Sequence, residues 1–222
     1  MNKNLLFQRN ELLSSIQKKI RKFFGRYLFT NFFVFFFTNK KIDKDYFDIS
    51  YNELKNLKQH IPKKTKNVLS IGCGLAGFEV LLQNYILQYA KFFLLEKNFT
   101  SKKVVYGWDK NNKEAYNSII LTRKFINLNS LNNKNFYIYN VDKDTLPKKK
   151  FDLIISLKSL DYHYPFDLYK KYLKTNSTIK TIFIFDTIRP DYFKKIFKYV
   201  SIISSDYKKV HTSKRLVCSK FI

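Results

Sequence analysis

A glycine-rich turn at residues 72–77 is the stretch of this sequence best suited to hold a small molecule against the main chain. The chain has five glycines, and three of them fall within these six residues, which argues against chance. Glycine has no Cβ atom, so the backbone can approach a ligand closely. Cys73 and Ala76 add only small side chains, and Cys73 is better suited to packing than to nucleophilic attack. A helical pattern follows the turn, so the N–H groups and positive dipole end of that helix should face the same ligand.

Two carboxylates follow apolar runs of strand type and are candidates for binding a nucleoside. Glu96 ends the run at residues 92–95, and Asp142 follows the run at residues 136–139. Ligands of parallel sheets bind beyond the carboxyl ends of the strands, so both side chains are expected beside the glycine turn. A carboxylate roughly 20 residues after such a turn accepts hydrogen bonds from ribose hydroxyls. The alternative interpretation is two surface carboxylates on loops, and we favour the nucleoside site.

A polar segment after the apolar run at residues 151–156 could supply acid–base chemistry. His163 lies in this segment, and an imidazole that titrates near neutrality can accept the proton of a hydroxyl group. Asp161 could orient or charge the histidine, or face solvent. A histidine that is hydrogen-bonded only for structural reasons is an equally weighted alternative. Further candidates for contacting a substrate are Tyr162, Tyr164, Asp186 and Arg189, the last as a fork for phosphate or carboxylate or as a salt-bridge partner.

Strand-like and helix-like patterns alternate from residue 67 onward, which predicts an α/β domain with a mostly parallel sheet. The predicted strands cover residues 67–71, 92–95, 136–139, 151–156 and 181–185, with two closing strands near 199–203 and 216–221. The predicted helices cover residues 76–90, 113–128 and 166–173, and a further helix begins after Pro190. The closing strands could pair as a hairpin, which would add an antiparallel terminal strand. This arrangement would bring the glycine turn, both carboxylates and Ser156 around one crevice.

The first 61 residues differ from the rest and are predicted to form a helical N-terminal cap on a domain at residues 62–222. Residues 11–24 have the pattern of a basic amphipathic helix. The aromatic run at residues 27–37 is too short to span a bilayer. We favour its packing on the domain, where it would help to wall the pocket; the alternative is a helix, within residues 11–37, that lies on an anionic membrane surface with its basic side toward the headgroups. Residues 43–61 are predicted as a linker with a short helix at 51–60.

The formal net charge of +25 suggests polyanionic partners such as nucleic acid or anionic lipid. The lysines are spread along the chain, however, and dispersed lysine is more typical of a solvated surface. The two cysteines, Cys73 and Cys218, give neither a disulfide framework nor a paired metal-ligand spacing. We therefore expect no metal site and a reducing, cytoplasmic setting, with a peripheral position at the inner membrane face as the alternative.

Three segments resemble motifs of one known family in their order and spacing. Residues 68–77 resemble the first motif of class I S-adenosylmethionine-dependent methyltransferases, residues 142–147 resemble the segment after strand three, and residues 151–156 resemble the fourth motif. The match extends over residues 67–221. The resemblance implies a Rossmann-like sheet, an enzyme and S-adenosylmethionine as cofactor; an NAD-dependent dehydrogenase is the rival, which the Ile-Gly-Cys-Gly turn and Leu146-Pro147 disfavour.

The resemblance also assigns roles to residues. Gly72 and Gly74 would pass the methionine part of the cofactor, Glu96 would hold the ribose hydroxyls and Asp142 would face the adenine. The remaining cofactor contacts expected from this resemblance come from Cys73, Ala76 and Ser156. Two positions depart from the family pattern: Ser70 stands where an acidic residue is common, and Ala76 where a third glycine is often found.

The methyl acceptor is predicted from the segment at residues 156–165. It lacks the Asp/Asn-Pro-Pro-aromatic motif of amino-directed nucleic-acid methyltransferases and has no catalytic cysteine. Its Ser-x-x-Ser-x-x-x-His-Tyr-Pro pattern is similar to sugar O-methyltransferases of bacterial surface-glycan clusters. The resemblance therefore implies methyl transfer to a hydroxyl oxygen of a sugar or glycan precursor. An RNA methyltransferase, and a non-catalytic basic module that binds membrane or RNA, are the alternatives.

Overall fold

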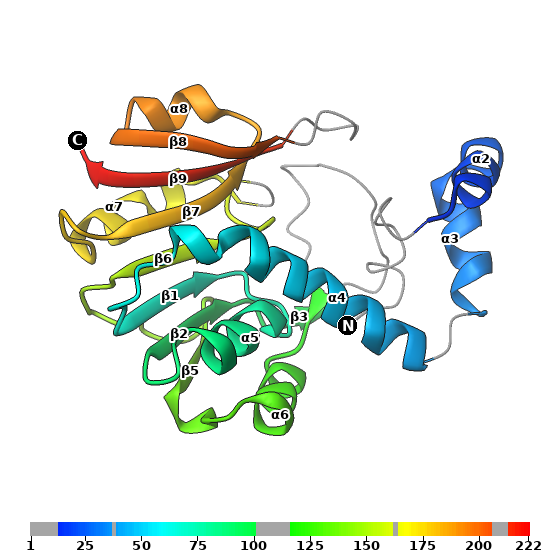
Figure 1. The fold of residues 1–222 in the computed structure, drawn as a ribbon, viewed down its shortest axis with the longest axis horizontal. Coiled ribbons are helices and arrows are strands. Elements are labelled where there is room, and N and C mark those ends of the chain that lie inside the picture. Colours follow the sequence, from blue (N-terminus) through cyan, green and yellow to red (C-terminus); the bar gives the residue numbers. More distant parts are fainter. Residues whose placement is uncertain (1–12, 37–38, 101–115, 162–163, 206–212) are drawn as a thin grey trace.

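A seven-stranded sheet forms the centre of the molecule (Figure 1). The computed structural model describes residues 13–36, 39–100, 116–161, 164–205 and 213–222. The strands of the sheet are β1 (Asn67–Ile71), β2 (Lys91–Glu96), β5 (Phe136–Asn140), β6 (Leu153–Ser156), β7 (Ile182–Thr187), β8 (Phe197–Ser205) and β9 (Lys214–Phe221). Their spatial order is β5-β2-β1-β6-β7-β9-β8.

The sheet is mostly parallel, as the sequence predicted. Strands β5, β2, β1, β6 and β7 pair in parallel, and β9 pairs antiparallel with both β7 and β8. The chain builds outward from β1 toward β5 on one side and from β6 toward β8 on the other. The carboxyl ends of β1 and β6 therefore flank the topological switch point, where open α/β sheets bind their ligands.

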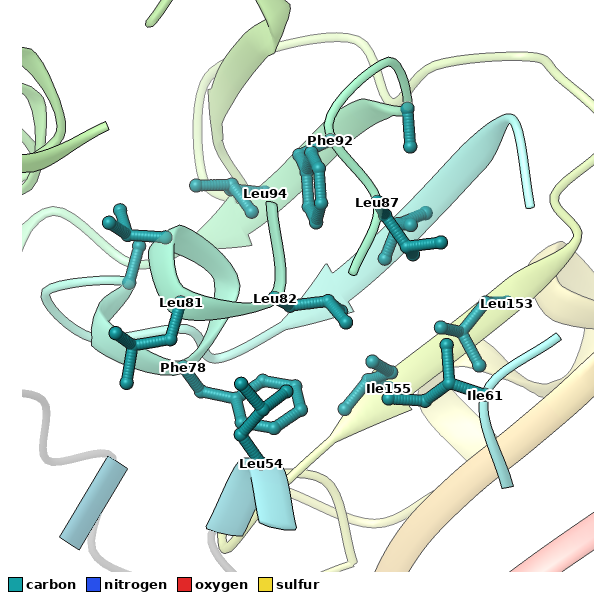
Figure 2. Packing of buried hydrophobic residues seen from close by; sticks show 14 of the residues in the cluster. Leu54, Ile61, Phe78, Leu81, Leu82, Leu87, Phe92, Leu94, Leu153 and Ile155 are labelled. Carbon is teal, nitrogen blue, oxygen red and sulfur yellow. The ribbon is translucent and has the colours of Figure 1, made fainter. Parts of the chain in front are cut away.

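Helices cover both faces of the sheet, because successive strand residues point to opposite faces. One apolar cluster joins Val68 to α5 (Gly77–Tyr85) and α6 (Ile119–Asn129), and Figure 2 shows part of it. A second cluster joins Leu69 to α7 (Asp167–Thr175) and α8 (Pro190–Lys194). A short pair, β3 (Phe99–Thr100) and β4 (Tyr116–Asn117), lies outside the main sheet.

Helix boundaries differ from prediction at two places near the site. The helix after the glycine turn was predicted to reach residue 90, but α5 ends at Tyr85. The next helix was predicted over residues 113–128, whereas α6 covers Ile119–Asn129 and residues 116–117 form β4. Residues 113–115 lie outside the described part of the chain.

The N-terminal region contains one long helix where a linker with a short helix at residues 51–60 was predicted. Helix α4 (Asn39–Leu57) runs for 19 residues and continues into a 3-10 turn, η2 (Lys58–His60). Its C-terminal half buries Leu54 and Leu57 in the first apolar cluster, over α5 and β6 (Figure 2). This packing stabilises a helix whose lysine- and aspartate-rich first half gave the appearance of a linker.

Helices α2 (Ser15–Phe24) and α3 (Arg26–Val34) pair with each other away from the sheet (Figure 1). Leu13 and Phe29 are buried in a small cluster of their own, separate from the two clusters of the α/β domain. The favoured expectation, that the aromatic run packs on the domain, is wrong for Phe32, Phe35 and Phe36, which are exposed. Among the described residues, no helix is both long and apolar enough to cross a membrane.

Candidate ligand-binding site at the end of strands β1 and β6

The glycine turn leaves β1 through a left-handed backbone. Gly72, Gly74 and Ala76 have φ angles of +73°, +60° and +64°. A left-handed residue with a Cβ atom costs about 1–2 kcal/mol, so Ala76 carries strain that glycine would avoid. The Gly72 N–H donates to the Leu95 carbonyl oxygen at 2.8 Å, which ties the turn to β2.

The Gly74 peptide is held from both sides. Its N–H donates to Glu96 Oε2 at 2.6 Å, while its carbonyl oxygen accepts from Thr122 Oγ1 at 2.7 Å and Asn117 Nδ2 at 2.8 Å. The space where a Gly74 Cβ would point is open, with no heavy atom within 4 Å. Asn117 and Thr122 were not predicted, because nothing in their local pattern indicates a contact more than 40 residues away along the chain.

The predicted acidic residues Glu96 and Asp142 lie at the same edge of the sheet. Glu96 is 9% exposed and also accepts from the Lys97 N–H at 2.9 Å. Burial raises the pKa of Glu96, and the hydrogen bonds from Gly74 and Lys97 lower it in part. The carboxylate of Asp142 lies 3.8 Å from Lys97 Nζ and is half exposed, at the rim of the crevice.

A buried carboxylate that was not predicted, Glu79 of α5, lies under the glycine turn. Ser70 Oγ donates to Glu79 Oε1 at 2.5 Å. Burial raises the pKa of Glu79 to about 7. Ser70 stands where an acidic residue is common in the family that the sequence resembles, and Glu79 of α5 supplies a carboxyl group next to that position. A single acidic residue inside the apolar run of residues 78–82 was the signal that could have revealed it.

A cavity of about 130 Å³ lies between the glycine turn and α4. It is lined by the two buried partners Ser70 and Glu79. Further lining residues come from α4, from the turn and the start of α5, and from the loop after β6 (residues 157–161, the β6 loop): Tyr46, Ile49, Ser50, Glu53, Gly72, Cys73, Gly77, Phe78, Leu157 and Lys158. Burial and the nearby carboxylates of Glu96 and Glu79 raise the pKa of Cys73 well above its usual value. The thiol is therefore protonated, which agrees with packing rather than nucleophilic chemistry.

Two side chains partly cover the turn. The Gly77 N–H donates to the Tyr46 hydroxyl of α4 at 3.0 Å. This N–H group at the start of α5 was expected to face a ligand, and it is bound by Tyr46 instead. A Cβ at Gly72 would lie 1.9 Å from Ser159 Oγ, so the bare backbone of Gly72 admits Ser159. At Gly74, by contrast, the space beside the backbone is open.

Ser156 joins the carboxyl ends of β6 and β1. Its hydroxyl donates to the Ile71 carbonyl oxygen at 2.9 Å and accepts from the Leu160 N–H at 2.9 Å. The side chain is fully buried. With its donor and one acceptor position used by the main chain, Ser156 fixes the β6 loop beside the glycine turn.

Asp161 fixes the end of the β6 loop through Thr187 and Arg189. The Asp161 carboxylate accepts a hydrogen bond from Thr187 Oγ1 at 2.5 Å. Its Oδ1 atom also accepts from Arg189 Nε at 2.8 Å and from Arg189 Nη2. Arg189 also lies over the Tyr192 ring, 4.2 Å from its centroid. Arg189 is thus a salt-bridge partner, the second of the two roles expected for it, and the alternative that Asp161 faces solvent is wrong, because its side chain is buried. The role of Asp161 in orienting His163 stays a prediction. Tyr162 and His163 lie outside the described residues.

Tyr164 is influenced by the same two carboxylates, Glu96 and Asp142. Burial raises its pKa, and the charges of Glu96 and Asp142 raise it further. These two carboxylates come from β2 and from the segment after β5. Tyr164 therefore shares one electrostatic environment with the predicted nucleoside-binding residues.

A buried ionic network links α4 to the β6 loop and to β9. Arg215 Nε and Nη2 donate to the Asp186 carboxylate at 2.7 and 2.9 Å, and Arg215 Nη1 donates to Glu53. Lys158 Nζ lies 3.4 Å from Glu53, and the Lys158 N–H donates to Asp186 at 3.1 Å. Asp186, a predicted pocket residue, thus has a structural partner in Arg215.

Comparison with known proteins finds likeness in structure. No protein-family model and no curated protein sequence matches the chain. Its fold is similar to that of precorrin-6y C5,15-methyltransferase from Geobacter metallireducens GS-15, with a TM-score of 0.51 at 12% identity over 78% of this chain and 88% of that one.

Two further structures have similar folds. The O-methyltransferase segment of StiE gives a TM-score of 0.55 at 12% identity, over 82% of this chain and 78% of that one. A candidate O-methyltransferase from Nostoc punctiforme PCC 73102 gives 0.53 at 9% identity, over 82% of this chain and 58% of that one. Together with the strand order, these likenesses define the fold as the Rossmann-like fold of class I methyltransferases.

Proposed function

We propose that this protein binds S-adenosylmethionine and transfers its methyl group to a hydroxyl oxygen, on a sugar or glycan precursor. The observation that carries the proposal is the Glu96 carboxylate bound to the Gly74 main chain beside the switch point between β1 and β6. Glu96 would then accept hydrogen bonds from the ribose hydroxyls next to a backbone that a ligand can approach closely. The folds that resemble this one belong to methyltransferases, which supports the proposal.

The residues present fit the proposed cofactor in parts. The cavity of about 130 Å³ is smaller than typical ligand pockets of roughly 300–1,000 Å³, so it suits one polar end of the molecule. Ser70 and Glu79 offer a hydroxyl and a carboxyl group there to an amino-acid moiety. The open space at Gly74 suits the nucleoside, with Glu96 for its ribose and Asp142 at the rim for its base.

The protein would contribute mainly by positioning. S-adenosylmethionine supplies an electrophilic methyl group. Holding two reactants in line can provide about 7–11 kcal/mol of the barrier. Ser156 and the Asp161–Arg189 pair fix residues 157–161 beside the glycine turn, directly before the segment that contains His163. His163 in that segment would accept the hydroxyl proton, a contribution of about 10²- to 10⁴-fold.

Calorimetric titration with S-adenosylmethionine tests the cofactor assignment. Glu96→Gln keeps the shape of the side chain but removes its charge, and a hydrogen bond to a charged group is worth about 1.5–3 kcal/mol. Binding should weaken roughly 10- to 100-fold. Asp191→Asn, an exposed carboxylate on α8, should leave binding unchanged. Absence of binding to the unaltered protein would contradict the cofactor and favour the non-catalytic alternative.

Labelled donor identifies the acceptor. Methyl-labelled S-adenosylmethionine is added to a cell extract with the protein, and the label is followed into glycan and RNA fractions. Label in glycan that is lost with His163→Ala, while cofactor binding is retained, would support the proposal. Label in RNA would favour the RNA methyltransferase, whose binding should fall steeply with salt.

A further inference from the structure

Helices α2 and α3 use only part of their apolar surface to pack together. Leu13 and Phe29 are buried between them, and Ile20 and Phe33 pack against this pair. The rings of Phe29 and Phe33 lie with their centroids 4.5 Å apart. The helix pair, residues 13–36, therefore has a small core of its own on one side.

A second apolar face of the helix pair is exposed to solvent. Its members on α3 and the turn that follows are spaced as i, i+4, i+7 and i+8, which places them on one side of a helix. They are Leu28, Phe32, Phe35 and Phe36, exposed by 69%, 62%, 88% and 69%. Helix α2 adds the exposed side chains of Ile16, Phe23 and Phe24. A patch of large apolar residues of this kind marks an interaction site.

The charge of the helix pair is entirely basic. Residues 15–34 contain Lys18, Lys19, Arg21, Lys22 and Arg26 and no acidic residue. The side chains of Lys18, Lys19 and Lys22 are exposed. A basic helix with aromatic and aliphatic residues on its other face is typical of segments that lie in the interface of an anionic membrane.

We propose that helices α2 and α3 dock the protein on the surface of an anionic lipid bilayer. The apolar face at residues 28–36 would enter the boundary between headgroups and acyl chains, and the lysines of α2 would contact the headgroups. A bilayer suits this face better than a second copy of the chain, because a copy would bring an equally basic helix pair against it. The helices would lie in the surface, since no described helix is long and apolar enough to span the membrane.

Docking would also place the candidate site near the membrane. Helix α4 follows α3, and Tyr46 in its first half accepts through its hydroxyl from the Gly77 N–H of the glycine turn (Figure 1). At about 1.5 Å per residue, the distance along α4 from its first residue, Asn39, to Tyr46 is roughly 10 Å. The proposal does not depend on the nature of the reaction, so vesicle binding and cofactor binding test separate claims.

Flotation with vesicles tests the apolar face. The full chain is mixed with vesicles of phosphatidylcholine alone or with about 30% phosphatidylglycerol, and the floated fraction is measured. The unaltered protein should float with the anionic vesicles and much less with the neutral ones. The triple variant Phe32→Ser, Phe35→Ser, Phe36→Ser should lose flotation. The control, Tyr89→Ser, Ile120→Ser, Leu131→Ser, removes equally exposed apolar residues elsewhere and should float normally.

A charge series tests the headgroup contacts. A surface lysine contributes about fivefold to binding an anionic leaflet, so Lys18→Gln, Lys19→Gln, Lys22→Gln together should weaken it up to roughly 100-fold. Arg123→Gln, Lys124→Gln, Lys171→Gln removes the same charge from α6 and α7 and should have a smaller effect. Circular dichroism checks that each variant is folded. Three results would overturn the proposal. The first is failure of the unaltered protein to float with anionic vesicles, and the second is an equal loss of binding in the lysine variant and its charge control. The third is a protein that binds no vesicles but forms a dimer by light scattering, which the phenylalanine variant converts to a monomer.

Discussion

Gly72 and Gly74 share a left-handed backbone, yet the space around them differs. Ser159 packs directly on Gly72, where any Cβ atom would overlap its hydroxyl, whereas the space at Gly74 is open. Alanine at Gly74 would add only the left-handed strain of about 1–2 kcal/mol to the fold. The same side chain at Gly72 would also displace the β6 loop. Gly72 therefore serves loop packing, whereas the space at Gly74 is where the proposed ligand would find room.

At the residue scale, Glu79 makes stability depend on pH. Its pKa is about 7 in the folded protein and 4.5 as the ordinary value, so the folded state binds the proton more tightly. The contribution of Glu79 to the free energy of unfolding should fall as pH rises from about 4.5 to 7, by roughly 3 kcal/mol at most, and stay level above that. Glu79→Gln should remove much of this slope, so its stability compared with the unaltered protein should be better at pH 8 than at pH 5.5. Urea unfolding at these pH values measures the difference.

The Glu79 prediction has a matched control. Asp48→Asn changes an exposed carboxylate on α4 and should keep the slope of the unaltered protein. Glu96, whose pKa is also raised, gives a slope of the same sign and should remain in both variants. If Glu79→Gln and the unaltered protein show the same dependence on pH, the carboxyl group of Glu79 is not the one that titrates.

At the element scale, α4 connects segments that are distant in sequence. It contributes Leu54 to the core, Tyr46 to the glycine turn and Glu53 to the ionic network with Arg215. The resulting contacts hold the β6 loop and β9 together across the face of the sheet. Loss of any one of these three contacts of α4 should loosen the packing of α4 over the cavity more than the packing of the sheet.

Glu53→Gln should destabilise the attachment of α4. The variant removes a charged partner from Arg215 and Lys158, while Arg215 keeps its two hydrogen bonds to Asp186. Hydrogen bonds to charged groups are worth about 1.5–3 kcal/mol, so a loss in this range is expected. Thermal or urea unfolding measures it, and exposed Asp48→Asn should stay within about 0.5 kcal/mol of the unaltered protein. Equal stability of the two variants would show that the network adds nothing to the attachment.

The elements of the sheet could be predicted because each strand is a local apolar pattern. The strand at residues 67–71 was predicted with its observed bounds, and the positions of Glu96 and Asp142 followed from the rule for carboxyl ends of strands. Only the end of helix α4 was recognised, as the short helix at residues 51–60, because its full length depends on packing of Leu54 and Leu57 against distant elements. Local periodicity carries no information about such contacts.

The site was predictable only where a sequence motif marks it. The turn and Glu96 were found, and their contact at Gly74 is present. Asp161 and Arg189 were identified as functional, but their mutual pairing across 28 positions could not be read from either neighbourhood. Glu79, Asn117 and Thr122 were missed because their importance comes from the tertiary contacts that converge on the turn.

At the scale of the whole molecule, charge is unbalanced. The chain carries 42 lysines and arginines against 17 acidic residues, and several of those acids are committed to internal pairs such as Asp186 and Asp161. Each of these pairs removes one charge of each sign, so the remaining surface carries the whole excess of positive charge, formally +25. Like charges repel in the compact state and destabilise it.

Salt should raise the stability of this protein. From 0.01 to 0.1 M sodium chloride the screening length falls from about 30 to 10 Å, which weakens repulsion between distant surface lysines. The buried pair of Arg215 and Asp186 is screened much less, so it should be retained. Tm should therefore rise, by about 2–4 °C for each kcal/mol of repulsion removed. Calorimetry measures the rise, and potassium chloride should give the same shift because ionic strength is the cause. A Tm that falls with salt would mean that surface ion pairs outweigh the excess of positive charge.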